Sequence, residues 1–146
     1  MAKFEKSIII AAPTGEVFDY VQQPERLCSL LPISDLTFLT HMHRGVGTRV
    51  RYGLDLGSKQ VVTECSLGQV KVDESVKYHS TTGVMFDWDL TIDQVEGGTQ
   101  LRWQGEYEAP LSFLDRVLGR GAAIQQAMES AIDDSLRKLK EALESE

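Results

Sequence analysis

The chain has 146 residues, of which 42% are hydrophobic and 25% are charged, as is typical of one folded domain. A chain of this length buries roughly two-thirds of its unfolded surface, so it needs no disulfide or metal for stability. Its 15 Lys and Arg against 22 Asp and Glu give a net charge of -7, and the basic residues are scattered. This excludes nucleic acids and anionic membrane surfaces as favoured partners, because both bind clustered positive charge.

We expect a single domain over residues 1–146, in the cytoplasm and without metal or other cofactor. No apolar segment is long enough to cross a membrane, and the apolar run near the N-terminus is too short for a signal peptide. Cys28 and Cys65 form no CxxC pair, and His41, His43 and His79 lie at no spacing typical of structural zinc.

The first third of the chain predicts one strand and two short helices. Residues 4–11 predict the strand, which ends before Pro13. Proline is favoured in a first helical turn, and the apolar residues that follow it at helical spacing predict a helix up to Val21. Pro24 interrupts this helix and begins a second one that extends to Leu30.

From Ser34 to Ala109 the apolar period changes to two, which predicts an antiparallel meander with one solvated face. Strands are expected at 36–43, 49–56, 61–67, 76–82, 86–93 and 101–108. The pairs Gly57-Ser58 and Gly97-Gly98 predict hairpin turns. After Phe113 the period becomes helical, and the apolar stripe is so wide that this long helix must pack on the sheet.

This order of elements resembles the START-like (SRPBCC) superfamily, of the polyketide cyclase/dehydrase and lipid-transport type. The resemblance is carried by Ile8–Val21 followed by Pro24-Glu25, by Gly98–Trp103 and by Leu136–Glu141. It implies an α+β helix-grip fold, in which a curved antiparallel sheet of about seven strands surrounds the long C-terminal helix. Two short helices follow the first strand.

If Trp88 and Trp103 face the helix, the alternation defines which residues enclose the space between sheet and helix. From the sheet these are Tyr52, Leu54, Val61, Thr63, Cys65, Tyr78, Ser80, Phe86, Trp88, Leu90, Trp103 and Tyr107, and from the helix Phe113, Val117, Ile124 and Met128. None is Asp, Glu, Lys, Arg or His, so the set suits a hydrophobic ligand held by packing and a few hydroxyls. The same residues would also form a solid core without a ligand.

Other candidate groups have simpler explanations. Cys65 has no neighbouring His or Lys in the sequence to activate it. Asp87, Asp89 and Asp93 alternate with the apolar residues of their strand, so we expect them on the solvated face, opposite basic residues. His41 and His43 are expected to share one strand face near a loop, without a third metal ligand.

The resulting hypothesis is binding or carriage of a small hydrophobic ligand. The resemblance implies a lipid, an isoprenoid quinone, a polyketide or an aromatic metabolite. One alternative is a metal-free enzyme like polyketide cyclases and dehydratases, which would need a bulge that turns Glu64, His79 or Arg102 inward. Another is a protein-interaction module that uses the sheet edge or the acidic tail. The sequence leaves open whether the protein is a monomer or a homodimer.

Overall fold

The computed structural model describes residues 2–56, 59–108 and 121–145. The elements are β1 (Ala2–Ile10), α1 (Thr14–Val21), α2 (Pro24–Cys28), β2 (Ile33–Phe38), β3 (Arg49–Leu56), β4 (Lys59–Lys71), β5 (Ser75–Thr82), β6 (Met85–Val95), β7 (Gly98–Glu108) and α4 (Gly121–Glu144). The predicted start of the long helix before residue 121 and the Gly57-Ser58 turn lie outside the described residues.

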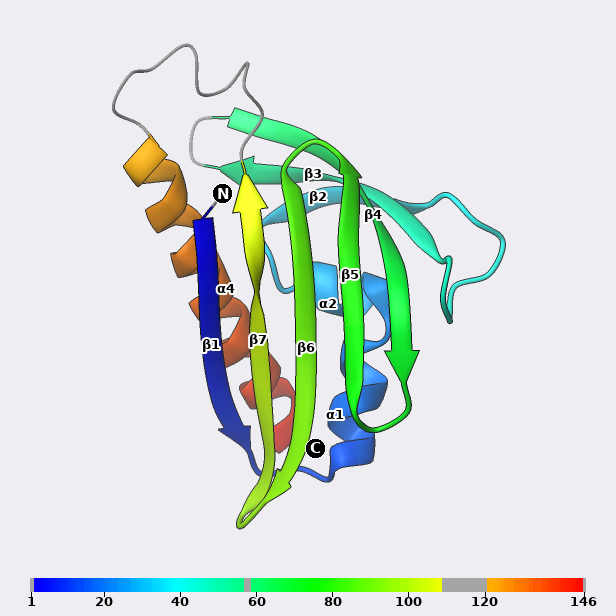
Figure 1. The fold of residues 1–146 in the computed structure, drawn as a ribbon, viewed down its shortest axis with the longest axis vertical. Helices are drawn as coiled ribbons and strands as arrows, with labels where there is room; N and C mark the ends of the chain where they lie inside the picture. The colour runs from blue at the N-terminus through cyan, green and yellow to red at the C-terminus, as the bar shows by residue number, and fades with distance from the viewer. Residues whose placement is uncertain (1, 57–58, 109–120, 146) are drawn as a thin grey trace.

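One antiparallel sheet of seven strands, in the order β1-β7-β6-β5-β4-β3-β2, holds the fold together. Helices α1, α2 and α4 all lie behind this sheet in the view of Figure 1, so they cover the same face. The sheet bends so that β2 and β3 cross the ends of the longer strands (Figure 1). This is the curved helix-grip α+β fold that the sequence predicts.

The second strand is shorter than its alternation predicts. β2 ends at Phe38, whereas we expected a strand up to His43. A register shift between Ser34 and Thr37, with Asp35 at a φ of 56°, makes this strand irregular. The chain then leaves the sheet, and His43 stacks on Phe38 with ring centroids 3.7 Å apart. His41 and His43 therefore do not share a strand face.

The last turns of α4 are bonded to the end of β1. Lys140 Nζ donates a hydrogen bond to the Ile9 carbonyl at 2.7 Å. The backbone N–H of Ala11 donates to Glu144 Oε2 at 2.8 Å, and Lys140 also pairs with Glu144 at 2.7 Å. These contacts fix one end of the helix relative to the sheet.

We expect the Glu144 contacts to make stability depend on pH. The hydrogen bond from Lys140, and then that from Ala11, lower the pKa of the Glu144 carboxyl. A lowered pKa stabilises the fold above the carboxyl's ordinary value, and the contribution is lost as pH falls through the lowered value. Glu144→Gln should therefore unfold at lower urea concentration than the wild type at neutral pH, with a difference that shrinks in acid.

Glu108→Gln is the matched control, because it removes a charge from an exposed position that makes neither contact. Urea denaturation of the three proteins at about pH 7 and about pH 3 provides the comparison. A Glu144→Gln deficit of the same size at both pH values would contradict the prediction.

Candidate inner-face site

The residues predicted to face the helix are buried wherever the structure describes them. These are Tyr52, Leu54, Thr63, Cys65, Tyr78, Ser80, Phe86, Trp88, Leu90, Trp103, Tyr107 and Met128, and Val61 is partly buried against them. Phe113, Val117 and the side chain of Ile124 lie outside the described residues. The predicted strand phases are thereby confirmed, and binding of a ligand by these side chains stays a prediction.

The centre of this inner face is a cluster of aromatic rings. Trp88 is in contact on one side with Phe86, to which it stacks at a centroid distance of 3.9 Å. On the other side it meets Trp103 at 5.0 Å, with the ring planes at 79°. Phe4 of β1 adds its ring 6.4 Å from Trp103 and 6.0 Å from Tyr107.

Sequence reasoning did not include Phe4 among the site residues. Its place in the cluster depends on the pairing of β1 with β7, where Phe4 lies opposite Gly105. Alternation within residues 4–10 puts Phe4 in phase with the buried Ile10, and this signal was available. The pairing of β1 with β7 could not be predicted in this way, because the two strands are far apart in the sequence.

Most hydroxyls of the inner face are used by the protein itself. The Tyr78 hydroxyl donates to the Val21 carbonyl of α1 at 2.6 Å. Ser80 Oγ accepts the Phe86 N–H at 2.7 Å, and Thr63 Oγ1 accepts the Val84 N–H at 3.3 Å. These bonds tie the sheet to α1 and hold strand ends, so they are structural.

Three buried polar atoms of the inner face lack a hydrogen-bond partner in the described structure. They are the indole Nε1 atoms of Trp88 and Trp103 and the hydroxyl of Tyr52. Buried polar groups in native proteins are nearly always bonded to protein or water, so each such atom calls for an explanation. Tyr52 has the thiols of Cys28 and Cys65 beside it, and these are weak acceptors. The two indoles have no such neighbour among the residues that the structure describes.

The two cysteines lie together in the core rather than apart. The structure buries both thiols, which are free. A hydrogen bond with Cys65, and after it burial, raises the pKa of Cys28 well above its usual range. Burial does the same for the pKa of Tyr52 and of Tyr78. A raised pKa makes the Cys28 thiol a poor nucleophile, so Cys28 serves as packing beside the buried Cys65.

Glu64, His79 and Arg102 all lie away from the inner face. A register shift does occur in β4 between Glu64 and Cys65, yet Glu64 pairs with Arg49 at 3.3 Å. Arg102 pairs with Glu5 at 3.3 Å, and His79 is exposed. Among the described residues, the strands therefore bring no carboxylate or imidazole to the inner face for acid–base catalysis.

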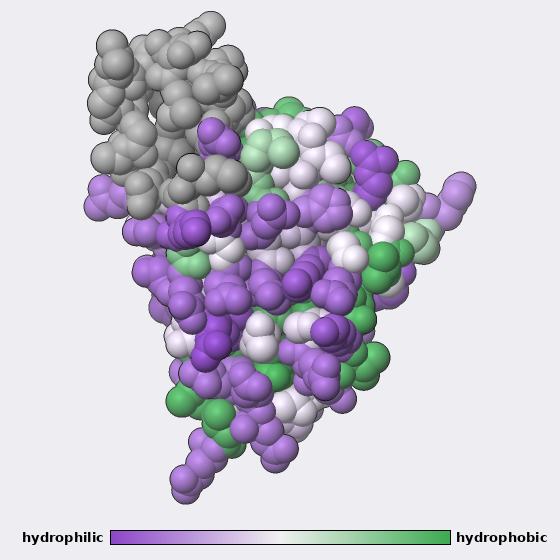
Figure 2. Space-filling view, in the orientation of Figure 1, coloured by the Kyte–Doolittle hydropathy of each residue, from purple (hydrophilic) through white to green (hydrophobic). Residues whose placement is uncertain are grey.

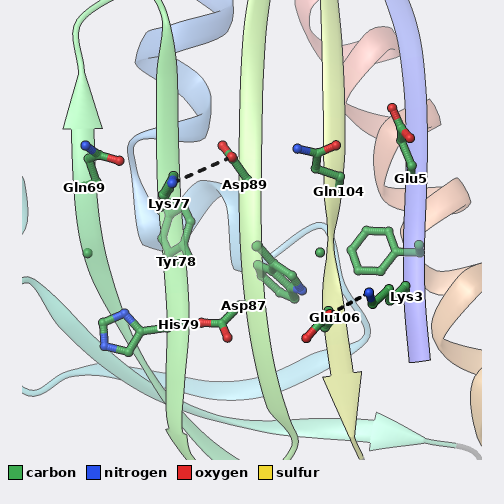
Figure 3. A pocket seen from close by; sticks show the side chains of 14 residues that line it. Lys3, Glu5, Gln69, Lys77, Tyr78, His79, Asp87, Asp89, Gln104 and Glu106 are labelled. Carbon is green, nitrogen blue, oxygen red and sulfur yellow. Dashed lines mark ion pairs between the residues drawn. The ribbon is translucent and has the colours of Figure 1, made fainter. Parts of the chain in front are cut away.

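An open groove of about 950 Å³ lies on the opposite, outer face of the sheet. Figure 3 shows that polar side chains of five strands surround it, including the ion pairs Lys77–Asp89 at 3.9 Å and Lys3–Glu106 at 3.5 Å. Asp87 also lines the groove and Asp93 is exposed, so the predicted solvated face is confirmed for the three aspartates. A basic partner is confirmed for Asp89, whereas Asp87 lies opposite His79 and Glu106. The face is largely hydrophilic in Figure 2. Several of its charges are paired, as Lys3 with Glu106 and Lys77 with Asp89.

A pair of matched variants tests which inner-face hydroxyls are structural. Tyr78→Phe leaves the buried Val21 carbonyl without its donor, so it should lower the free energy of unfolding by about 1–3 kcal/mol. Tyr52→Phe deletes the same atom where it meets only the weakly accepting thiols of Cys28 and Cys65, so it should cost clearly less than Tyr78→Phe. Urea denaturation of both variants measures the contrast, and equal losses would refute it.

The architecture and its uncharged inner face define a helix-grip domain of the SRPBCC type. Residues 1–144 match the sequence pattern of the family described as polyketide cyclase / dehydrase and lipid transport, and the chain belongs to this family. No curated protein matches the sequence.

Solved structures share the fold at low sequence identity. A protein of Thermus thermophilus is 18% identical with a TM-score of 0.79, and the alignment covers 97% of each chain. The KanY protein is 13% identical with a TM-score of 0.77, covering 98% of this chain and 97% of that one. A Deinococcus radiodurans protein is 14% identical with a TM-score of 0.68, covering 99% and 98%.

Two further observations concern the described residues alone. None of their helices combines the length and apolar character needed to span a membrane. No three of their His, Cys, Asp or Glu side chains come together as metal ligands would.

Proposed function

We propose that this protein binds and carries a small hydrophobic molecule between the inner face of the sheet and the C-terminal helix. The observation that carries the proposal is an aromatic, uncharged inner face on which buried indole N–H groups have no partner within the described residues. Packing against the rings would supply affinity, and hydroxyl or indole groups would orient the ligand. Membership of a family whose description includes lipid transport supports this function.

Native mass spectrometry of freshly purified protein, followed by organic extraction, tests the proposal. We expect a bound hydrophobic molecule in near-stoichiometric amount. If the protein is empty, titration with a hydrophobic fluorescent probe should quench the tryptophans, because Trp88 and Trp103 are at the centre of the inner face. An empty protein whose tryptophan emission no probe alters would show a solid core and overturn the proposal.

The second candidate is catalysis of the cyclase or dehydratase kind, and one observation favours it. Burial raises the pKa of Tyr107 to about 12, and the charge of Glu129 on α4 adds to the shift, so a carboxylate lies within electrostatic range of this phenol. Incubating the extracted ligand with fresh protein and following its mass distinguishes the two functions. An unchanged ligand supports carriage, whereas loss of water that Glu129→Gln abolishes supports catalysis.

The third class, a protein-interaction module, receives no support from the described surface. Its large exposed apolar side chains are spread over β1 (Ile9), β4 (Val62), β6 (Met85), the β4–β5 turn (Val72) and the β2–β3 loop (Met42 and Val46). A docking surface normally needs a contiguous apolar patch.

A further inference from the structure

We propose that the groove on the outer face of the sheet is a second binding site, whose ligand is a linear diamine or polyamine. The groove lies on the side of the sheet away from the ring cluster, so this inference does not depend on the proposed function. It is carried by the shape of the groove, by the arrangement of acceptor groups in it and by a buried oxygen atom that has no partner.

The groove is shaped in part by a glycine in an irregular stretch of β4. The register shifts between Leu67 and Gln69, as a β-bulge at Gly68 would produce. An added Cβ at Gly68 would lie 3.0 Å from Nδ1 of His79, so the absence of a side chain lets the imidazole lie against β4. In Figure 3 the His79 ring points toward β4 and away from β6. The hollow of about 950 Å³ therefore reaches across the acceptor groups of β6 and β7.

Four side chains with acceptor oxygens form two cross-strand pairs in this groove. Asp87 of β6 lies opposite Glu106 of β7, and Asp89 lies opposite Gln104. Alternate residues of a strand share a face, so the two pairs are about 6.6 Å apart along the strands. Like charges directly opposite one another destabilise a sheet, so the Asp87–Glu106 pair favours a cation between its carboxylates.

The lysines of the groove leave these acceptors incompletely bonded. Lys3 reaches Glu106 at 3.5 Å from a side chain that is 80% exposed, and such pairs are weak. Lys77 Nζ is 3.9 Å from Asp89 Oδ2, which is beyond hydrogen-bond distance. Asp89 Oδ1 is buried and has no hydrogen-bond partner among the described residues. Within the same part of the chain, Asp87 has no ion pair, as Figure 3 shows for the groove.

A chain with an ammonium group at each end fits this arrangement. An ammonium group has three donors and no acceptor, so it suits carboxylate and amide oxygens. One ammonium would bind between Asp87 and Glu106 and the other between Asp89 and Gln104, with four methylenes spanning the distance of about 6.6 Å. A metal ion is too compact to reach both pairs. The net charge of -7 also attracts cations to the protein over a longer range.

Three probes test the site on the full-length protein: 1,4-diaminobutane, butylamine and magnesium chloride. The backbone amide NMR signals of the protein, followed during each titration, give both the location and the dissociation constant. A salt concentration of about 0.1 M limits long-range attraction to about 10 Å. We expect 1,4-diaminobutane to shift amides of β6 and β7 beside the groove and to bind about fivefold more tightly than butylamine. Magnesium should bind more weakly than the diamine at these amides.

Asp87→Asn and Asp93→Asn are matched variants. Both remove one negative charge from β6, but Asp93 is exposed outside the groove and lies about 20 Å along the strand from Asp87. Asp87→Asn should weaken binding of 1,4-diaminobutane about fivefold, whereas Asp93→Asn should weaken it less than about twofold. Asp87→Asn breaks no ion pair of the described residues, and the amide spectrum shows directly whether the variant is folded.

Each contrary result overturns a stated part of the inference. Equal weakening in the two variants would mean that the diamine responds to overall charge, and the groove would not be its site. Butylamine or magnesium binding as tightly as 1,4-diaminobutane at the same amides would show that the spacing of the acceptor pairs is not recognised, so the ligand class would be wrong. If 1,4-diaminobutane shifts no amide beside the groove, the site itself is refuted.

Discussion

Replacing Gly105 with alanine is expected to lower the free energy of unfolding by about 3 kcal/mol, because the site has no room for a methyl group. A Cβ atom at this position would lie 1.9 Å from the carbonyl oxygen of Asp87 on the neighbouring strand. Both groups belong to the backbone of paired strands, so neither can move by rotating a side chain. β6 and β7 would have to separate where Gly105 lies opposite Trp88.

Gly15→Ala is the matched control for this substitution. Gly15 lies in α1, and the nearest atom to an added Cβ, an oxygen of Asp73, is 3.9 Å away. Alanine should stabilise this helix by about 0.5–1 kcal/mol. Thermal or urea denaturation should therefore move the two variants in opposite directions, and a Gly105→Ala variant as stable as the wild type would show that the strands separate easily.

Trp103→Ala is expected to cost about 3–5 kcal/mol of unfolding free energy. The ring is fully buried at 0% exposure, and it contacts Phe4 and Trp88 on two neighbouring strands. Its removal leaves a cavity that three hydrogen-bonded strands cannot close by collapsing. Circular dichroism is the appropriate probe of unfolding, since the substitution also removes a fluorophore.

Val72→Ala provides the comparison for Trp103→Ala, because Val72 is 73% exposed and should change stability by less than about 0.5 kcal/mol. If Trp103→Ala also cost less than about 1 kcal/mol, the indole would not be part of a packed interior. The inner face would then already contain empty space around the ring.

Alternation predicted the orientation of the inner face because each central strand buries one face and leaves the other in solvent. In β6, Phe86, Trp88, Leu90 and Ile92 are buried, as their spacing indicates. The same rule placed Asp87 and Asp89 outside, where Asp89 meets Lys77. The period of two is enough to predict which side chains of such a strand are buried, since a register slip by one residue would move every side chain to the other face of the sheet.

The sequence did not predict features that depend on contacts between residues far apart in the chain. It also failed where irregular local backbone geometry ends a strand before its apolar alternation does. Alternation continues past Phe38, yet the irregular pairing of β2 ends the strand there. The contact between Cys28 and Cys65 needs α2 to lie over β4, which no periodicity encodes. The unused N–H groups of the tryptophans were equally beyond reach, because they depend on what surrounds each indole in three dimensions.

The bonds between the end of α4 and the end of β1 have a consequence for biosynthesis. They join residues 131 and 133 positions apart, and β1 also takes its strand partner from β7, late in the chain. At ribosomal speed, β1 would wait on the order of ten seconds for these partners. Its apolar Ile8–Ile10 segment is unprotected during that time. We therefore expect the domain to fold only once α4 has been synthesised, and chaperones to bind the nascent chain before then.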